Sequence, residues 1–419
     1  MLRKILFLVL LLVATPLLAA DDPPFFIERI DVRNHYRVSP DVVVAESLLH
    51  EGRAYSEAEL RDAALRLSRL PFLLSVDFSL EKGTERGRYV LVLSINETKP
   101  FFYTLDLVPY LEDDQRNVDV DYRDRPASSG GDSFGFGFRW FVGRRGVIHL
   151  GAQGTREDRA FTREYAALSA GYTQYDLFGT RAFVTLNLKQ PVEGLGAGLL
   201  SPQVVAGLPL TAKQTMTLSY DETRFAPEGD DQTFPCACED GVGQRVVSAR
   251  WSYNTTNEPF VPTKGTVLNV TPNYLFADGV DNRVVNNRIV ETGPFHARAY
   301  GLEIGATRYH ELSERNSIWG DLRGEWARID RRSAVSDRTY ANTATSASVG
   351  LGYVFSLWTR EERTGGDNRF ELAARYTNKS NRESEAFHGY ADDDVGQLAW
   401  SWIRRSSFGT LRLGVGYAW

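Results

Sequence analysis

The stretch that decides the fold is Ser133-Phe134-Gly135-Phe136-Gly137-Phe138-Arg139-Trp140. Four aromatic residues alternate here with a serine, two glycines and an arginine. Side chains alternate between the two faces of a strand, so this segment is predicted to be a strand with one strongly apolar face. The same period of two recurs along the later part of the chain, at 182–189, 215–220, 246–253, 350–355 and 411–419. From about Phe101 onward the pattern therefore predicts an all-β region.

Two features of these strands indicate which solvent surrounds them, since a water-soluble sandwich shows the same alternation. Aromatic residues recur at segment ends, where a membrane barrel has its interfacial girdles. The alternate faces carry mostly Gly, Ser, Thr, Asn, Arg and Glu, which suits a hydrated lumen. Lipid cannot satisfy the hydrogen bonds of an open sheet edge, so we expect a closed transmembrane antiparallel barrel.

The strand count follows from length. About 320 residues (101–419) at roughly 20 residues per strand and turn predict about 16 strands, and bacterial barrels have even numbers. Fourteen strands are the alternative, because 114–124 and 284–309 do not read clearly as strand or loop. The longer polar stretches, among them 276–288 and 378–394, are expected to be extracellular loops.

The N-terminus has the three regions of a secretory signal peptide. Arg3 and Lys4 precede the apolar run Ile5 to Ala14, and small residues follow at Ala19-Ala20. The run is too short to span a bilayer as an anchor. We expect residues 1–20 to be removed, and residue 21 is Asp, so there is no cysteine for a lipoprotein anchor.

The charge balance is acidic. The chain has 48 basic and 54 acidic side chains, a net charge of −6, and removing Arg3 and Lys4 leaves 46 against 54, or −8. This balance gives no support to nucleic-acid binding.

Residues 21–100 are predicted to form a separate small α+β domain in the order β-α-α-β-β. Ser39-Pro40 begins a first helix that Gly52 ends, and Ser56 with Glu59 makes a capping box for a second helix that Pro71 stops. The three strands are expected at 25–32, 74–80 and 89–95.

This order resembles a polypeptide-transport-associated (POTRA) domain. The similarity is carried by Leu70-Pro71-Phe72 leading into Val76-Asp77-Phe78, and by the closing run 92–97. The resemblance implies a periplasmic domain that binds extended client chains or partner proteins by adding a strand to a sheet edge.

The last strand carries Leu411, Leu413, Val415, Tyr417 and Trp419 on one face and resembles the C-terminal signature of bacterial outer-membrane proteins. A second similarity is the turn at 257–266, which contains Pro259, Pro262 and Gly265. Together with the POTRA-like domain, it resembles the outer-membrane protein assembly superfamily of the bacterial surface antigen type.

That resemblance implies a 16-stranded barrel that inserts or translocates polypeptides, with a weak seam between its first strand, near Tyr103 to Tyr110, and its last. The chain departs from the family in one respect: after Gly265 it has no Arg-Gly-Phe/Tyr loop motif.

Candidate chemical sites are few. Cys236 and Cys238 lie in a polar loop, where they form either a strained disulfide or two thiols, and no neighbouring pair of ligands favours a metal. Ser133 stands in a G-x-S-x-G pattern, but that motif needs a following helix to expose its nucleophile, and here a strand follows. We therefore expect no enzyme activity, no cofactor and no metal.

The sequence predicts an integral barrel of the bacterial outer membrane. The resemblance implies that its N-terminal domain lies in the periplasm and that it acts in outer-membrane protein assembly, insertion or translocation. Its expected partners are membrane lipid and lipopolysaccharide, together with extended polypeptide clients and periplasmic proteins that bind the N-terminal domain. The alternative is a passive channel or surface structural protein with the same fold, and a third hypothesis is a barrel enzyme acting on lipids.

Overall fold

The computed structural model describes residues 24–107, 110–112, 133–155, 165–192, 201–225, 242–257, 262–285, 288–333, 339–358, 367–383 and 390–418. The predicted signal peptide, Cys236, Cys238, Pro259 and Trp419 lie outside these residues. Within the described part of the chain, no helix is both long enough and apolar enough to cross a membrane.

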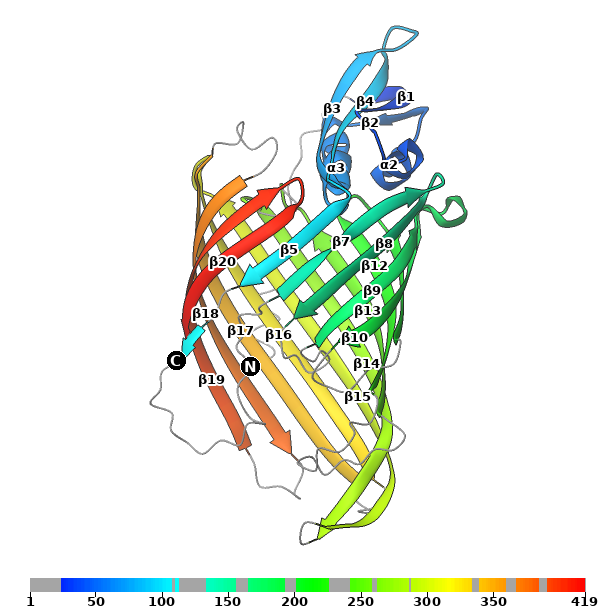
Figure 1. Cartoon of the computed structure of the whole chain (residues 1–419). Coiled ribbons are helices and arrows are strands. Elements are labelled where there is room, and N and C mark those ends of the chain that lie inside the picture. The colour runs from blue at the N-terminus through cyan, green and yellow to red at the C-terminus, as the bar shows by residue number, and fades with distance from the viewer. Residues whose placement is uncertain are drawn as a thin grey trace.

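The N-terminal domain packs two helices on one four-stranded sheet (Figure 1). Its elements are β1 (Phe25–Arg33), α2 (Pro40–Ser47), β2 (Arg53–Tyr55), α3 (Glu57–Ser68), β3 (Leu73–Lys82) and β4 (Arg88–Glu97). The sheet order is β2-β1-β4-β3, with β1 parallel to β4. The predicted order therefore gains one short strand, β2, which is too brief to leave a periodic pattern in the sequence.

The helix boundaries follow local chemistry. The predicted capping box is present: the Ser56 side chain accepts from Glu59 N–H, and the Glu59 carboxylate accepts from Ser56 N–H. Pro40 begins α2 as predicted, although the Ser39 side chain makes no capping hydrogen bond. Gly52 does not end α2, because the chain already leaves the helix at Leu48, which is left-handed with φ 63°.

The domain's core lies between the helices and the sheet, where Val42, Leu60, Leu67, Leu91 and Leu93 are almost completely buried. Leu91 and Leu93 lie two positions apart in β4, and Leu60 and Leu67 lie seven positions, about two helical turns, apart in α3. Each pair therefore faces the core from one side of its element.

The described residues of the second domain form a closed barrel of 15 strands (Figure 1). Its strands are β5 (Phe101–Leu107), β6 (Tyr110–Glu112), β7 (Ser133–Val142), β8 (Gly146–Thr155), β9 (Tyr165–Gln174), β10 (Phe183–Val192), β11 (Ser201–Pro209), β12 (Gln214–Phe225), β13 (Val242–Asn254), β14 (Gly265–Val285), β15 (Arg288–Glu311), β16 (Asn316–Ser333), β17 (Thr339–Ser356), β18 (Asp367–Glu383), β19 (Tyr390–Ser406) and β20 (Gly409–Ala418). Segments β5 and β6 both pair with β20 along the same edge and count as one strand.

The expected count of 16 or 14 strands is therefore wrong. The estimate assumed that all strands have the same length. Instead, β14 and β15 have 21 and 24 residues, and most of the ambiguous stretch 284–309 belongs to this one long hairpin. The other ambiguous stretch, 114–124, lies outside the described residues. Neighbours in the barrel are antiparallel, so an odd number leaves the first and last strands running in the same direction, and β20 pairs with β5 in parallel.

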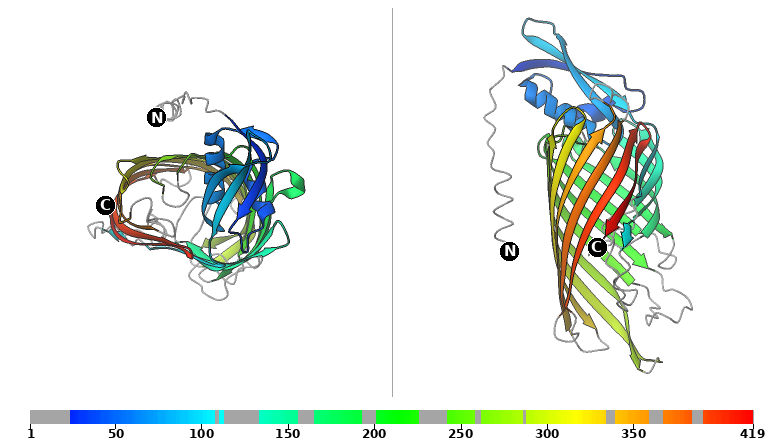
Figure 2. Two further views of the ribbon diagram at one scale, coloured as in Figure 1. Left: turned by 90° about the horizontal axis from the view of Figure 1, so that it is seen from above. Right: turned by 90° about the vertical axis from the view of Figure 1, so that its left-hand side faces the viewer.

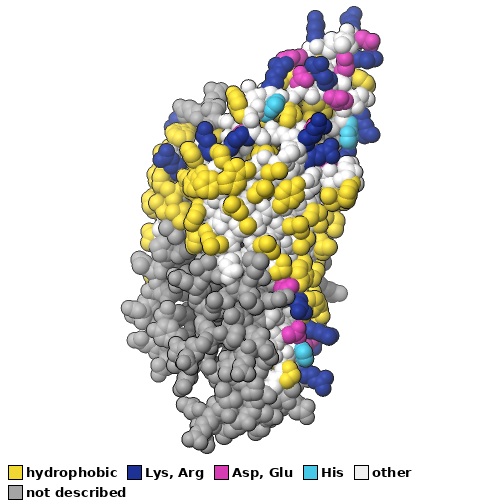
Figure 3. Space-filling model, turned by 45° about the vertical axis from the view of Figure 1, so that its right-hand side comes forward, with side chains coloured by type: hydrophobic (Ala, Val, Ile, Leu, Met, Phe, Trp, Pro, Cys, Tyr) yellow, Lys and Arg dark blue, Asp and Glu magenta, His cyan; other side chains and the backbone are white. Residues whose placement is uncertain are grey.

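The outer face of the barrel is apolar. Phe136, Leu150, Leu186, Leu218 and Leu351, which come from five different strands, are each between 44 and 66% exposed. Figure 3 shows hydrophobic side chains forming a band across the visible side of the described wall. A closed sheet with such a band has the form of an outer-membrane barrel.

The wall is uneven in height. Strands β7 to β11 have 9 or 10 residues, which is about what a bilayer requires, whereas β14 to β19 have 17 to 24. Figure 2 shows the long strands extending beyond the short ones at the end opposite the N-terminal domain. Much of the polar stretches 276–288 and 378–394, which the sequence suggested as loops, is strand in these extensions.

Candidate functional site

The candidate site is the junction where the N-terminal domain meets the barrel, together with the barrel's seam beside it. The two domains are joined by Thr98-Lys99-Pro100. Thr98 N–H donates to Phe72 O at 3.0 Å, and Lys99 N–H donates to Ser407 O in the β19–β20 turn at 2.9 Å. The link is thus fixed at both ends and begins β5 next to the barrel's last strand.

An apolar contact seals the junction. The Phe72 ring packs edge-on against Phe141 and Tyr175 of the barrel, with centroids 5.2 and 5.7 Å apart. Val147 belongs to the same buried cluster as the domain's core, and Phe183 packs against it. The two domains therefore share one hydrophobic core, so separating them would expose aromatic surface on both sides.

Arginines from both domains bond to backbone carbonyls across the junction. From the barrel, Arg139 and Arg405 donate to Pro71 O and Leu74 O, each at 2.7 Å. From α3, Arg69 donates to Ala212 O and Thr256 O, each at 3.3 Å. Burial, with Arg66 nearby, lowers the pKa of Arg69 to about 10, so the side chain still carries its charge at neutral pH.

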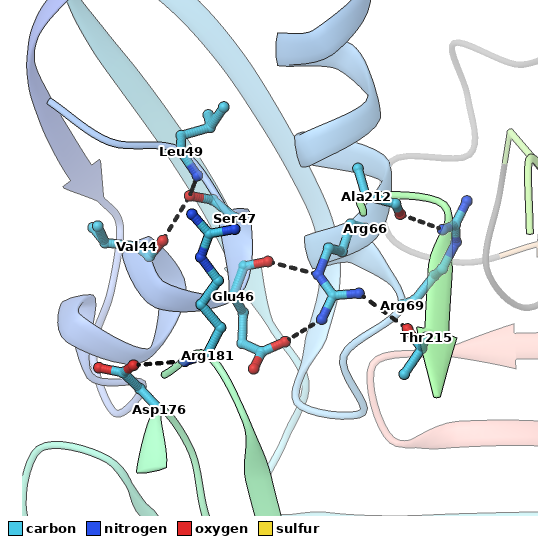
Figure 4. Close-up of polar contacts among 10 residues, drawn as sticks. All are labelled: Val44, Glu46, Ser47, Leu49, Arg66, Arg69, Asp176, Arg181, Ala212 and Thr215. Atoms are coloured by element: carbon cyan, nitrogen blue, oxygen red, sulfur yellow. Dashed lines mark hydrogen bonds and ion pairs between the residues drawn. The ribbon is translucent and has the colours of Figure 1, made fainter. Parts of the chain in front are cut away.

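A buried ion pair lies behind these contacts (Figure 4). Arg66 Nη2 lies 2.6 Å from Glu46 Oε2, and the side chains are 10 and 2% exposed. Arg66 also donates to Glu46 O at 2.8 Å and to Thr215 Oγ1 on the barrel at 3.4 Å. Burial raises the pKa of Glu46, which outweighs the opposing effect of Arg66. Glu46 Oε1 has no hydrogen-bond partner among the described residues.

The domain's sheet has a long free edge at β3, since β4 is the only strand that pairs with β3 in the described sheet. Leu74 lies in the bulge where β3 has one residue more than β4, and its carbonyl is the group that Arg405 of β19 binds. The free edge therefore begins at the barrel wall beside the seam and runs away from the membrane.

The seam itself is a parallel ladder that is split between β5 and β6. β20 pairs with β5 over five residue pairs, from Gly409 with Tyr103 to Leu413 with Leu107, and with β6 over three. By contrast, β14 and β15 share 21 pairs. Gly409 has φ 151°, and a Cβ there would lie 1.7 Å from Tyr103 O, so only glycine allows the first seam pair to form.

Inside the barrel, polar side chains bridge alternate strands across glycines. His149 of β8 reaches Asn187 of β10 at 2.6 Å over Gly171. On the opposite wall, Trp319 Nε1 of β16 donates to Glu371 of β18 at 2.7 Å over Gly352. These bridges stiffen the wall and line the lumen with polar groups. The described side chains include no group of three or more His, Cys, Asp or Glu placed to hold a metal ion.

The predicted site residues are only partly visible. Leu413, Val415 and Tyr417 of β20 are 38 to 46% exposed on the outer face, and Leu411 alternates in step with them. Gly265 begins β14 with φ 114°, and a Cβ there would lie 2.5 Å from Thr255 O, which explains a glycine at the turn that also contains Pro262. Ser133 begins strand β7 and is followed by strand, not by the helix that a nucleophile elbow requires.

Sequence reasoning missed the junction. Phe72 was noted only within the POTRA-like step at 70–72. Phe141 and Tyr175 belong to the segment-end aromatics that were assigned to interfacial girdles, and Arg66 was not singled out. Nothing in the sequence around Arg405 indicates a partner 331 residues away.

No protein-family model and no curated protein matches the chain. Among solved structures, it is similar to BamA from Haemophilus ducreyi lacking POTRA domains 1–3, with 11% identity and a TM-score of 0.39, covering 94% of this chain and 85% of that one. It is also similar to CdiB from Acinetobacter baumannii, with 9% identity and a TM-score of 0.38, covering 94 and 74% of the two chains. A third likeness is to OmpT, an outer membrane protein of Vibrio cholerae, with 9% identity and a TM-score of 0.32, covering 76 and 94%. Scores this low assign no function by themselves.

Proposed function

We propose that the protein is an outer-membrane barrel that takes up extended polypeptides through its periplasmic N-terminal domain and passes them to the barrel seam, for membrane insertion or translocation. In this proposal the domain is POTRA-like and the reaction is mechanical, without a catalytic group. The observation that carries it is the bond from Arg405 to Leu74 O, which holds the start of the free β3 edge against the wall next to β20.

The mechanism follows from this placement. A strand added along β3 would satisfy the edge's backbone groups, and its end would lie beside the parallel ladder that closes the barrel. The eight residue pairs of β20 with β5 and β6 are the pairs that must part or be extended if a client strand enters the wall. No other pair of neighbouring strands in the described barrel runs in parallel, and parallel pairing is slightly less stable per residue.

Photo-crosslinking in cells tests client capture. A photoreactive residue at Asp77, which is exposed on β3, should crosslink to unfolded outer-membrane or secreted proteins, whereas the same residue at Arg61, exposed on α3, should not. Depletion of the protein should then change the outer-membrane proteome or secretion. Equal crosslinking from both positions, or an unchanged proteome and secretion, would contradict the proposal.

A passive channel is the second candidate, because the domain lies over only one side of the barrel opening (Figure 2). Stable, ion-selective conductance in planar bilayers without any client would favour it over polypeptide handling.

A further inference from the structure

A cleft of about 500 Å³ lies at the end of the barrel that carries the N-terminal domain. It is lined by the β7–β8 turn, residues 143–145, with Val142 and Gly146 beside it, and by Tyr172 and Gln174 at the end of β9. Nothing in the proposed handling of polypeptides uses this cleft.

The cleft opens on the outer, lipid-facing side of the wall. Gly146 pairs with both Val142 and Gln174, and Ile148 pairs with Tyr172, so these residues share one face of the sheet. On that face Val142 and Ile148 are 46 and 37% exposed. The residues between them, Phe141, Val147 and Tyr175, point the other way and pack against the N-terminal domain. The cleft is therefore continuous with the apolar band.

Its upper edge is cationic. The Arg144 side chain is 88% exposed, and its nearest carboxylate, Asp41, is 3.8 Å from Nε. Arg145 is fixed by Asp176 at 2.8 Å and remains 40% exposed. The Tyr172 hydroxyl lies over Gly146, where a Cβ would come within 2.6 Å of it. That hydroxyl donates to Gln174 Oε1. The two guanidinium groups above an apolar floor match the phosphate and acyl chain of a phospholipid.

The neighbouring turn presents an aromatic side chain at the same level. Tyr175 N–H donates to Arg145 O, and Asp176 and Phe178 adopt positive φ angles of 48° and 54°. Such strain persists where surrounding contacts hold it, here the Asp176 carboxylate bonded to Arg145 and to Arg181 N–H. Phe178 is 91% exposed, and the turn projects outside the wall in both Figure 1 and Figure 2. This is where interfacial aromatics anchor a membrane protein.

We propose that this cleft binds an anionic phospholipid of the leaflet on the domain's side, with its phosphate on Arg144 and Arg145 and an acyl chain along Val142. The Phe178 ring enters the membrane–water interface beside this lipid. The lipid would then sit directly behind Phe141 and Val147, which hold the N-terminal domain, so a bound lipid also braces the junction.

Native mass spectrometry of the full-length protein tests this site. The protein is released from micelles that contain equal amounts of phosphatidylglycerol and phosphatidylcholine. It should retain one phosphatidylglycerol molecule more often than one phosphatidylcholine molecule. Arg144→Glu should lower that preference about fivefold or more, because each basic side chain near an anionic surface contributes about that much. Tyr172→Phe should lower it less. Arg144 is exposed, so its substitution leaves the fold intact.

The matched control is Arg86→Glu, the same charge reversal at an exposed position on the far hairpin of the N-terminal domain, which should leave retention unchanged. Equal retention by wild type and Arg144→Glu, equal loss in Arg86→Glu, or equal retention of phosphatidylcholine would each overturn the proposal. Displacement by millimolar glycerol phosphate would show that the arginines recognise free phosphate, and would overturn the lipid as the ligand. None of these outcomes depends on client capture.

Discussion

The Glu46 side chain is buried, and burial destabilises its ionised form. The ion pair with Arg66 offsets this destabilisation. Removing one partner of a buried ion pair leaves the other charge uncompensated. We expect Arg66→Ala to lower the free energy of unfolding by about 3–5 kcal/mol. Chemical denaturation of the full chain, followed through the N-terminal domain, measures this. Arg61→Ala, at an exposed pair with Glu57, should cost about 0.5 kcal/mol or less, and an equal loss in both variants would contradict the assignment.

The same residue gives a pH prediction. The pKa of Glu46 is raised in the folded protein, so the folded state binds more protons than the unfolded chain between the ordinary and the raised value. This contribution to the free energy of unfolding is complete below the ordinary carboxyl pKa and is lost as the pH rises through the raised one. Glu46→Gln should remove this part of the pH dependence. Denaturation series at several pH values compare the two slopes, and identical slopes would refute the shift.

Gly409 is the residue on which the seam depends. Gly409→Ala places a methyl group against Tyr103 O and should weaken the β20–β5 ladder by roughly 1–3 kcal/mol. The measurement is the temperature at which the folded barrel loses its compact form on unheated gels. Gly305→Ala serves as control, because a Cβ at Gly305 meets nothing within 4 Å. If both variants melt together, the seam does not limit barrel stability.

At the scale of elements, the long hairpin β14–β15 extends beyond the length that a membrane requires. About 10 residues of each strand suffice to span the bilayer, while the hairpin pairs all the way to Val285 with Arg288. We expect that replacing 281–293 by a two-residue Asn-Gly turn, which keeps Val280 paired with Pro294, leaves membrane assembly intact, as judged by compact gel mobility and protease protection. Deleting four residues from each of β10 and β11, which have no such excess, should abolish assembly. Failure of both variants would show that the extension is needed for folding.

The uneven strands explain what could be predicted from the sequence. Where a strand lies in lipid, one face is apolar, as in Phe134 to Trp140, and the pattern identified it. Where a strand extends beyond the lipid, both of its faces meet water, so 378–383 and 390–394 show no apolar-polar alternation and were predicted to be loop. The capping box at Ser56 is local and was predicted correctly. The contact of Phe72 with Phe141 and Tyr175 depends on where two domains dock, which no local pattern records.

At the scale of the molecule, the hydrophobic core shared by the two domains holds the N-terminal domain in place over one side of the barrel opening. Phe72→Ala removes the ring between Phe141 and Tyr175 and should free the domain from the barrel, at a cost of about 3–5 kcal/mol. We expect larger single-channel conductance in planar bilayers and faster proteolysis near Thr98-Lys99-Pro100. Phe25→Ala is the control, because Phe25 packs on Tyr89 within the domain. Unchanged conductance in Phe72→Ala would mean that the domain does not restrict the opening.

The odd strand number also fixes which way the chain points as it leaves the wall. Because β20 runs in the same direction as β5, Ala418 and the N-terminal domain lie on opposite sides of the bilayer. An epitope tag appended to the C-terminus should therefore be stained by antibody on intact cells, while one inserted in the β3–β4 hairpin should stain only after permeabilisation. Surface labelling therefore tests whether the number of strands is odd. In a barrel with an even number of strands, both tags would lie on the same side of the membrane as the N-terminal domain, and neither would be stained on intact cells.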